Sequence, residues 1–236
     1  MSAKVQDVNA IEKDVFVGLK DEQTVLKATR SILTLFTHIL VGIIVGVCFL
    51  FGLRNETQSV TDQHVLLCVF GYQLLMAEAI LAMAPDSWLS TLNLKHKKLL
   101  HWIMQVLGSL LALIGSFIKI LDKNQHWNTL HGQFALVAMV FTSVSLVNGL
   151  TSLYAFELRR FLPGLLSKLT HICFGVVGFL TASISLIYGF QKNSFRNWAT
   201  SDLTDIIIIL TAVFTAFVII NPFITFYGRF RGAINK

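Results

Sequence analysis

The stretch KHKKLLHWIMQVLGSLLALIGSF, from Lys95 to Phe117, joins a basic cluster to an apolar run that is long enough to cross a membrane. One ionisable residue, His101, lies about one turn inside the apolar run. A titratable side chain within a membrane helix is energetically costly, and such residues usually serve a function. The stretch therefore predicts a membrane-spanning helix that carries a functional histidine.

The rest of the chain has the composition of a membrane protein. Of its 236 residues, 54 % are hydrophobic and only 14 % are charged, whereas about a quarter of the residues in a soluble domain are charged. We expect an all-α membrane protein with six transmembrane helices in residues 31–228, between an N-terminal tail (1–30) and a C-terminal tail (229–236). The six segments that contain the roughly 20 mostly apolar residues of a span are Ile32–Leu53, Val60–Met83, Leu99–Leu121, Leu130–Leu153, Leu169–Phe190 and Asp205–Tyr227.

The basic residues are divided unevenly between the two membrane faces. Of the 19 Lys and Arg residues, 14 fall in the N-terminal tail, the second and fourth loops and the C-terminal tail, which share one face. The positive-inside rule then places both termini in the cytoplasm. The glycosylation sequon Asn55-Glu56-Thr57 lies in a loop on the other face, which agrees with this orientation. Because the basic residues lie at membrane edges rather than on one compact face, we expect no nucleic-acid partner.

Four histidines lie at matching positions in four consecutive spans. His64, His101, His131 and His171 are each near the N-terminal end of a predicted helix. Consecutive spans run antiparallel, so their N-terminal ends alternate between the two membrane faces. His64 and His131 should therefore share the non-cytoplasmic layer, and His101 and His171 the cytoplasmic layer. The pattern predicts two histidine pairs stacked across the bilayer.

Several interpretations of these histidines are open. A histidine at a membrane edge can extend to the headgroups, and intramembrane histidines also form proton relays. A zinc site fits poorly, because zinc takes four ligands or three and a water, and no Cys or carboxylate supports either pair. Two neutral imidazoles that face each other suit haem iron, and two axial histidines leave no position for dioxygen, so such iron carries electrons. We favour haem.

Small residues keep helical register with the histidines. Glycines lie seven residues after His64, seven and fourteen after His101, and four and seven after His171. They are Gly71, Gly108, Gly115, Gly175 and Gly178. Glycines on these faces would let a flat macrocycle approach the helix backbone, as they let helices approach one another.

The remaining candidates for the surroundings of the haems are one carboxylate and three further histidines. Glu78 lies fourteen residues after His64, which is about 21 Å deeper along the helix. There it could orient a ligand imidazole, or be protonated and bonded to a backbone carbonyl. His38 has no partner in this scheme and is expected to pack beside the site, whereas His96 and His126 lie in loops.

At these residues the sequence resembles the cytochrome b561 family, over essentially the whole chain from His38 onward. The matching stretches are GYQLLMAEAILAMAPDSW, KHKKLLHWIMQVLG, LHGQFALV, LSKLTHICFGVVGF and FVIINPFITFYGRF. They are most similar to the cytochrome b561 domain-containing transmembrane reductases of animals. The resemblance implies a six-helix protein, often a homodimer, with two b-type haems among helices 2–5. It makes His64 and His131 the ligands of the non-cytoplasmic haem, and His101 and His171 those of the cytoplasmic haem.

The resemblance also implies the substrates. The usual electron donor of the family is cytoplasmic ascorbate, and the acceptor on the other side is monodehydroascorbate radical or a ferric chelate. Ascorbate is a monoanion, so its candidate partners are the basic residues of the two cytoplasmic loops: Lys95, Lys97, Lys98, Arg159, Arg160 and Lys168. The candidates on the acceptor side are Lys119, Lys123 and His126. Animal relatives suggest the endoplasmic reticulum or a vesicle membrane as the location.

Two other functions remain open from the residues alone. A quinol-oxidising cytochrome b subunit would carry paired histidines too, together with a quinone pocket and partner subunits. A non-haem transporter or proton channel would use the histidines as a relay. Reducible haem bands in a visible spectrum would exclude the transporter, and fast reduction by ascorbate would exclude the quinol oxidase.

Overall fold

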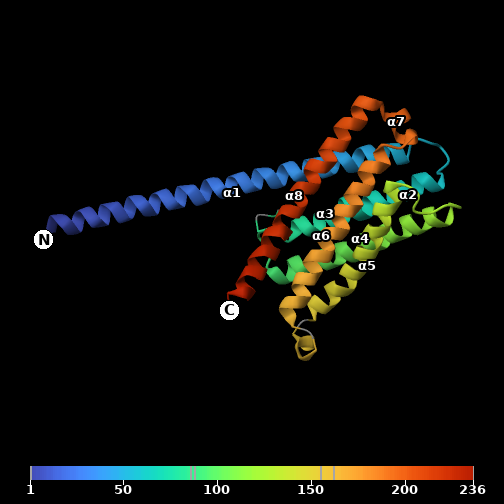
Figure 1. Ribbon diagram of the computed structural model, residues 1–236. Coiled ribbons are helices and arrows are strands. Elements are labelled where there is room, and N and C mark those ends of the chain that lie inside the picture. The colour runs from blue at the N-terminus through green and yellow to red at the C-terminus, as the bar shows by residue number, and fades with distance from the viewer. Residues whose placement is uncertain (1, 86, 88, 155, 162, 236) are drawn as a thin grey trace.

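The computed structural model describes residues 2–85, 87, 89–154, 156–161 and 163–235, with side chains from Glu22 onward except that of Arg159. These residues form helices and connections, without a strand among them (Figure 1). The elements are, in order, α1 (Ser2–Gly52), α2 (Val60–Cys68), the π-helical segment η1 (Val69–Met76), α3 (Ala77–Ala82), α4 (Leu94–Leu121), α5 (Leu130–Leu153), the 3-10 turn η2 (Glu157–Arg160), α6 (Gly164–Phe190), α7 (Asn193–Ala199) and α8 (Ser201–Ile234).

All six predicted spans are confirmed as helices that are long and apolar enough to cross a membrane. Their bounds are Glu22–Gly52, Val60–Ala82, Leu94–Leu121, Leu130–Leu153, Gly164–Phe190 and Ser201–Ile234. Several are longer than predicted, because polar residues extend the helix beyond the apolar core; α4, for example, begins within the basic cluster that precedes His101. The chain is an integral, multi-pass membrane protein.

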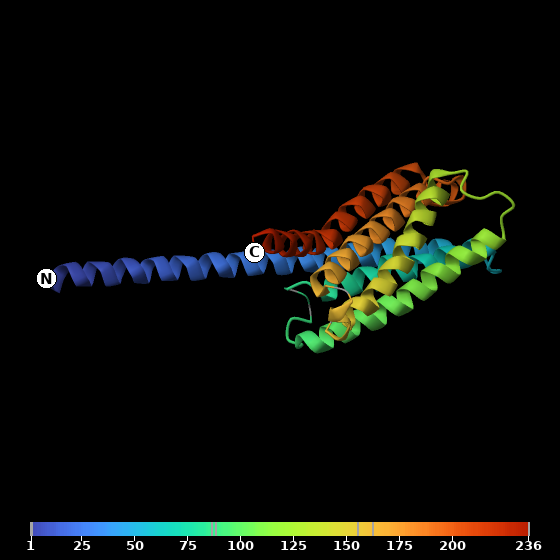
Figure 2. The same ribbon diagram turned by 60° about the horizontal axis from the view of Figure 1, so that its bottom comes forward.

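The first and last helices reach the same side of the bundle. The N-terminal part of α1 projects far beyond the other helices, and the C-terminal end of α8 lies toward it (Figures 1 and 2). No break separates the predicted tail from the first span, since α1 is continuous from Ser2 to Gly52. Below, "termini side" means the side of the bundle where α8 ends, and "far side" means the opposite side, where α7 lies.

The second span is not a regular α-helix. Its middle, Val69–Met76, is π-helical, with α2 before it and α3 after it. Such wide turns are rare and frequently occur at functional sites. Gly71 lies in this turn, and a Cβ atom on it would be 2.5 Å from the carbonyl oxygen of Gly108. Only glycine therefore allows this part of the span to pack so closely on α4.

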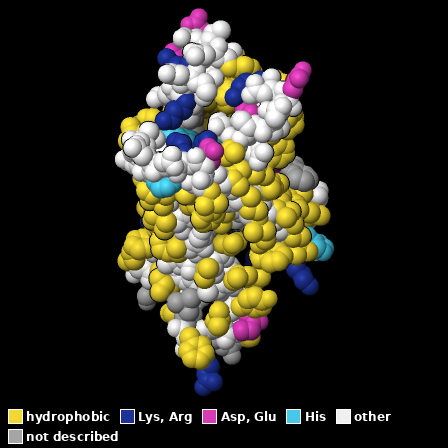
Figure 3. All heavy atoms as spheres, turned by 90° about the vertical axis from the view of Figure 1, so that its right-hand side faces the viewer, with side chains coloured by type: hydrophobic (Ala, Val, Ile, Leu, Met, Phe, Trp, Pro, Cys, Tyr) yellow, Lys and Arg dark blue, Asp and Glu magenta, His cyan; other side chains and the backbone are white. Residues whose placement is uncertain are grey.

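The interior and exterior of the bundle both suit a membrane. The main core cluster joins α1, the second span, α6 and α8, with Ile44, Phe179, Phe214 and Val218 completely buried or nearly so. Large hydrophobic side chains also remain exposed along the outer faces of the helices. Figure 3 shows them over the middle of one face, with most charged side chains of that face at its upper end. These apolar outer faces are suited to contact with lipid.

A buried carboxylate fixes the start of the second span, just before His64. Asp62 is completely buried and forms a capping box with Ser59, accepting its backbone N–H at 3.0 Å and its hydroxyl at 2.7 Å. Arg54 and Asn55 also donate to the Asp62 carboxylate. The side-chain amide of Asn55, the acceptor position of the sequon, is therefore engaged in this network.

Candidate functional site

The structure brings four histidines together as two facing pairs. The ring centres of His64 on α2 and His131 on α5 are 6.1 Å apart, and the ring planes meet at 86°. Those of His101 on α4 and His171 on α6 are 6.2 Å apart, again at 86°. The first pair lies toward the far side and the second toward the termini side. The arrangement matches the pairing that alternation of antiparallel helices predicts.

Each imidazole is held by a backbone carbonyl of a neighbouring helix. The Nδ1 atoms of His64, His101, His131 and His171 lie 2.8, 2.7, 2.8 and 3.0 Å from the carbonyl oxygens of Gly115, Ala79, Ser185 and Ser145. A carbonyl oxygen only accepts, so Nδ1 must carry the proton and donate it. The unprotonated Nε2 of each neutral ring is then free to bind a metal.

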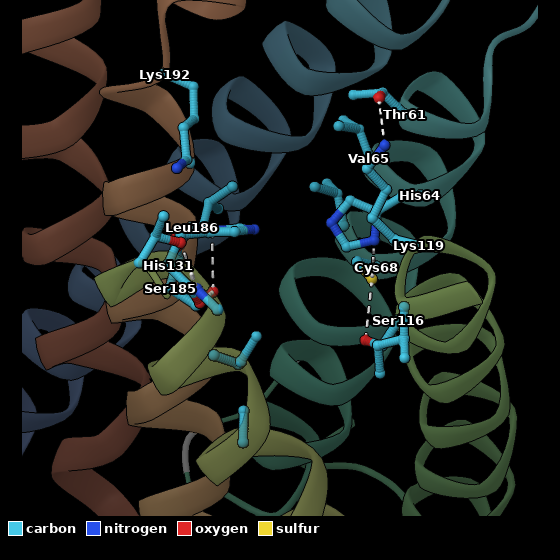
Figure 4. A pocket seen from close by; sticks show the side chains of 18 of the residues that line it. Thr61, His64, Val65, Cys68, Ser116, Lys119, His131, Ser185, Leu186 and Lys192 are labelled. Carbon is cyan, nitrogen blue, oxygen red and sulfur yellow. Dashed lines mark hydrogen bonds between the residues drawn. The ribbon is translucent and has the colours of Figure 1, made fainter. Parts of the chain in front are cut away.

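The far-side pair lines a cavity of about 320 Å³. Figure 4 shows His64 with Lys119 on one wall, and His131 with Lys192 on the other. The Lys119 ammonium donates to Thr61 at 2.8 Å and to Asp122 at 2.6 Å. The remaining basic residues of the lining are Lys123 and His126, so the wall on this side of the bundle is cationic.

The termini-side pair lines a second, larger cavity of about 580 Å³. Its basic residues are Lys98 on α4, Lys168 on α6 and Arg229 on α8. Lys98 and Lys168 each precede the histidine of their own helix by three residues, which places both cations about one turn closer to the membrane surface. Both cavities are within the range of about 300–1,000 Å³ that is typical of cofactor and small-molecule sites.

The glycines predicted to face a macrocycle lie in two kinds of surroundings, a cavity wall or a contact between helices. Gly175 does line the termini-side cavity. Gly71, Gly108 and Gly178 line neither cavity, and a Cβ atom on any of them would meet a neighbouring helix. Gly115 also packs against a neighbouring helix, but its carbonyl accepts the hydrogen bond from His64.

Two glycines that were not among the predicted site residues lie against the histidines. A Cβ atom on Gly149 of α5 would be 3.3 Å from Cε1 of His171, and one on Gly189 of α6 would be 3.4 Å from Cε1 of His131. Each glycine also lines the cavity of the histidine it faces. The two contacts are reciprocal between α5 and α6, so a pattern search across both helices could have found them.

The partner of Glu78 is His38, rather than one of the paired histidines or a backbone carbonyl, the two alternatives left open from the sequence. Its carboxylate accepts a hydrogen bond of 2.7 Å from Nδ1 of His38, which links α3 to α1. The acceptor for His101 is instead the carbonyl of the next residue, Ala79. His38 therefore lies beside the site through Glu78, and its Nε2 is buried without a hydrogen-bond partner among the described residues.

The predicted basic residues differ in which cavity they line, and some line neither. Lys98 and Lys168 line the termini-side cavity, and Lys119, Lys123 and His126 line the far-side cavity. The candidates Lys95, Lys97 and Arg160 are absent from the described lining; Lys97 donates to Ser87 instead. The side chain of Arg159 lies outside the described residues. Lys192 and Arg229 line the cavities but were not among the predicted site residues.

Comparison with known sequences identifies the family. The profile of eukaryotic cytochrome b561 matches residues 63–196, more than half of the chain and all four paired histidines. The chain belongs to the cytochrome b561 family. The transmembrane reductase CYB561D2 of Mus musculus is 33% identical to this cytochrome b561 over 181 residues, 73% of this chain and 79% of the relative. The Homo sapiens protein of the same name has the same identity and coverage. That of Bos taurus is 29% identical over 214 residues, 87% of this chain and 93% of the relative.

Membership of the cytochrome b561 family implies haem, and the histidine pairs fit it. Two imidazoles on opposite sides of a metal, with metal–nitrogen bonds of about 2.0 Å as in other histidine sites, have ring centres about 6 Å apart. Both pairs have this separation. No group of three or more His, Cys, Asp or Glu side chains among the described residues could hold a bare metal ion. A haem needs only the axial pair from the protein, so the donor sets suit haem better than zinc.

Proposed function

We propose that this cytochrome b561 is a di-haem transmembrane reductase. It oxidises cytoplasmic ascorbate and reduces monodehydroascorbate radical or a ferric chelate on the other side of the membrane. The observation that carries the proposal is the presence of two equivalent histidine pairs, one toward each side of a membrane-spanning bundle, each with its Nδ1 atoms bonded to backbone carbonyls.

In this proposal His64 and His131 are the axial ligands of one haem b, and His101 and His171 those of the other. Haem held by two histidines supplies a one-electron carrier, without an open position for dioxygen. The protein residues set its orientation, because each Nδ1–H donation fixes the tautomer and the ring orientation and leaves Nε2 available as the ligand atom. The hydroxyl groups of Ser185 and Ser145 lie 3.2 and 3.4 Å from the Nδ1 atoms of His131 and His171 and restrain the same two rings.

Basic residues at the two cavities give each side of the bundle affinity for an anion. On the termini side, Lys98 and Lys168 would attract the ascorbate monoanion, with Lys95, Lys97 and Arg160 contributing through the longer-range field of the surface. On the far side, Lys119, Lys123 and His126, joined by Lys192, would attract monodehydroascorbate or an anionic ferric chelate. The cations thus support small anions as both donor and acceptor.

The direction of electron flow rests on the orientation of the chain. We propose that both termini are cytoplasmic, because the loops and tails of the termini side carry most of the Lys and Arg residues. The cytochrome b561 would act as a homodimer in the endoplasmic reticulum or in vesicles, as its family resemblance implies.

Reconstituted vesicles test this function directly. The purified, haem-loaded protein is placed in liposomes that contain a ferric chelate and a colorimetric Fe²⁺ indicator, and ascorbate is then added outside. We expect Fe²⁺ to form inside only in vesicles that contain the protein, and monodehydroascorbate generated inside to be consumed in the same way. Absence of internal reduction, with haem present and vesicles intact, would refute a transmembrane reductase. Reduction by a quinol but not by ascorbate would favour the quinol-oxidising cytochrome instead.

A further inference from the structure

The last helix, α8, forms part of the termini-side cavity although it lies outside the region that matches the family profile. That region ends at residue 196, and α8 begins at Ser201. Four of its residues nevertheless line the cavity with His101 and His171: Asn221, Pro222, Thr225 and Arg229. The contribution of α8 to the cavity is therefore seen in the structure and not in the profile match.

The three polar residues of this wall lie on one face of α8. Asn221, Thr225 and Arg229 follow one another at intervals of four residues, which keeps their side chains on the same side of a helix. They extend over about 12 Å, from within the membrane span to its end. The adjacent residues Phe223 and Ile224 are apolar and exposed on the outside of the bundle. The three polar residues thus line the cavity, Thr225 and Arg229 at its exposed end, whereas Phe223 and Ile224 are absent from the lining.

The polar side chains of this face have no partner among the residues that the structure describes. No other described residue forms a hydrogen bond or an ion pair with the side chain of Asn221, Thr225 or Arg229. Unpaired polar groups within a membrane span are unfavourable, and they usually mark a pathway or binding site for a polar molecule. The unused hydrogen-bonding capacity on the cavity wall therefore indicates a ligand with several polar groups.

The charge of the residues that line the cavity indicates the sign of the ligand's charge. Lys98, Lys168 and Arg229 approach it from three different helices, and the described lining residues include no Asp or Glu. Lys98 and Lys168 also lack an ion pair among the described residues. Three cations around one cavity without a carboxylate between them favour an anion.

Proline within α8 helps to place this wall. Pro222 has no N–H to donate to the carbonyl of Val218, and such an interruption bends a helix. Figure 2 shows α8 changing direction along its length. The bend occurs between the buried first part of the helix and the segment that carries Thr225 and Arg229.

We propose that α8 supplies one wall of the electron-donor site, with Arg229 as the counter-ion of a small, hydroxyl-rich monoanion and with Thr225 and Asn221 as hydrogen-bond partners of its hydroxyl groups. This inference rests on the proposed function, in which ascorbate is the donor. The planar guanidinium of Arg229 suits two neighbouring oxygens of such an anion. The donor gives one electron to the protein and one proton to water, and it leaves as a radical anion. It therefore carries one negative charge both before and after the step, and Arg229 can pair with either form.

Arg231 provides a matched control for Arg229. It lies two residues further along α8, which is about 200° around the helix. Like Arg229 it is exposed, but it is absent from the cavity lining. Arg229→Gln and Arg231→Gln remove the same charge from the same end of the protein. The experiment measures haem content, and then the rate of haem reduction against ascorbate concentration, in both purified variants and the wild type. The same rates are measured with hydroquinone, a donor that is neutral at pH 7.

We expect Arg229→Gln to keep its haem and to need about tenfold more ascorbate for half-maximal reduction, the effect of losing one charge-assisted hydrogen bond. Arg231→Gln should stay within about twofold of the wild type, and hydroquinone should reduce all three proteins equally. Equal ascorbate dependence in the two variants would overturn the inference, and so would a loss of haem in Arg229→Gln, which would assign Arg229 to the cofactor. If ascorbate failed to reduce even the wild type, the proposed function itself would be refuted.

Discussion

Replacing His101 or His171 by alanine is expected to remove about half of the bound haem and to abolish reduction by ascorbate. Each residue is one of the two imidazoles whose rings lie 6.2 Å apart on the termini side. An alanine leaves the partner ring with its Nε2 unopposed, and one axial nitrogen alone does not hold a low-spin haem. Haem content by the pyridine haemochrome assay and the ascorbate-reduced spectrum measure the two effects.

Two kinds of variant provide the controls. One replaces a histidine of the far-side pair, and the other replaces His96, an unpaired histidine on the same helix as His101. His64→Ala or His131→Ala should lose a similar amount of haem, but the remaining haem should still be reduced by ascorbate. His96→Ala should retain full haem content, because His96 is exposed in the first turn of α4 and lines neither cavity. Full haem content in all four paired-histidine variants would show that the ligands are elsewhere.

Filling either cavity beside a histidine is expected to displace one haem selectively. A Cβ atom at Gly149 would already be 3.3 Å from the His171 ring, and one at Gly189 would be 3.4 Å from the His131 ring. Leucine at either position adds three further carbon atoms in the space next to the ring. Gly149→Leu should therefore lose the haem of the termini side together with ascorbate reduction, whereas Gly189→Leu should lose only the haem of the far side.

Gly42→Leu is the control for this pair of variants. Gly42 lies in another membrane-spanning helix, α1. Nothing lies within 4 Å of a Cβ atom built on it, so the added side chain enters open space. It should retain both haems and the reduction rate of the wild type. If Gly149→Leu and Gly189→Leu bound as much haem as Gly42→Leu, the volumes next to the histidine rings would not be the haem sites. A uniform loss of folded protein would be recognised by size-exclusion chromatography.

The membrane spans and the histidine pairing could be predicted because both depend on local patterns. A run of apolar residues is sufficient for a membrane helix, and Leu130–Leu153 was predicted with the same bounds that the structure has. Pairing follows from the strict alternation of antiparallel helices, which needs no knowledge of how the helices pack. His64 therefore meets His131, and His101 meets His171.

The residues that surround the histidine pairs are determined by helix packing, so they could not be predicted from local patterns. Register with a histidine along one helix favoured Gly71 and Gly108, but these two glycines face each other at the contact of the second span with α4. The glycines that do touch a histidine, Gly149 and Gly189, touch one on the neighbouring helix. The spacing of residues along a single helix gives no information about contacts with a neighbouring helix.

Long-range contacts also explain the two cations that were missed. Arg229 was assigned only to the cytoplasmic tail, because nothing in its own segment indicates that α8 reaches the cavity between α4 and α6. Lys192 lies in the short connection between α6 and α7 and points toward the far-side pair (Figure 4). For Glu78, the sequence indicated a buried acid but not its partner, since His38 is 40 residues away on α1.

The ratio of haem to polypeptide shows whether each pair of imidazoles holds one haem. The protein is expressed with ample haem supply and purified in detergent. Its haem is then determined by the pyridine haemochrome assay, and its polypeptide by quantitative amino-acid analysis. We expect about two haems per chain, both low-spin and both reducible, because both axial positions would be filled by histidine. A colourless protein, or a ratio that saturates at one haem per chain, would contradict it.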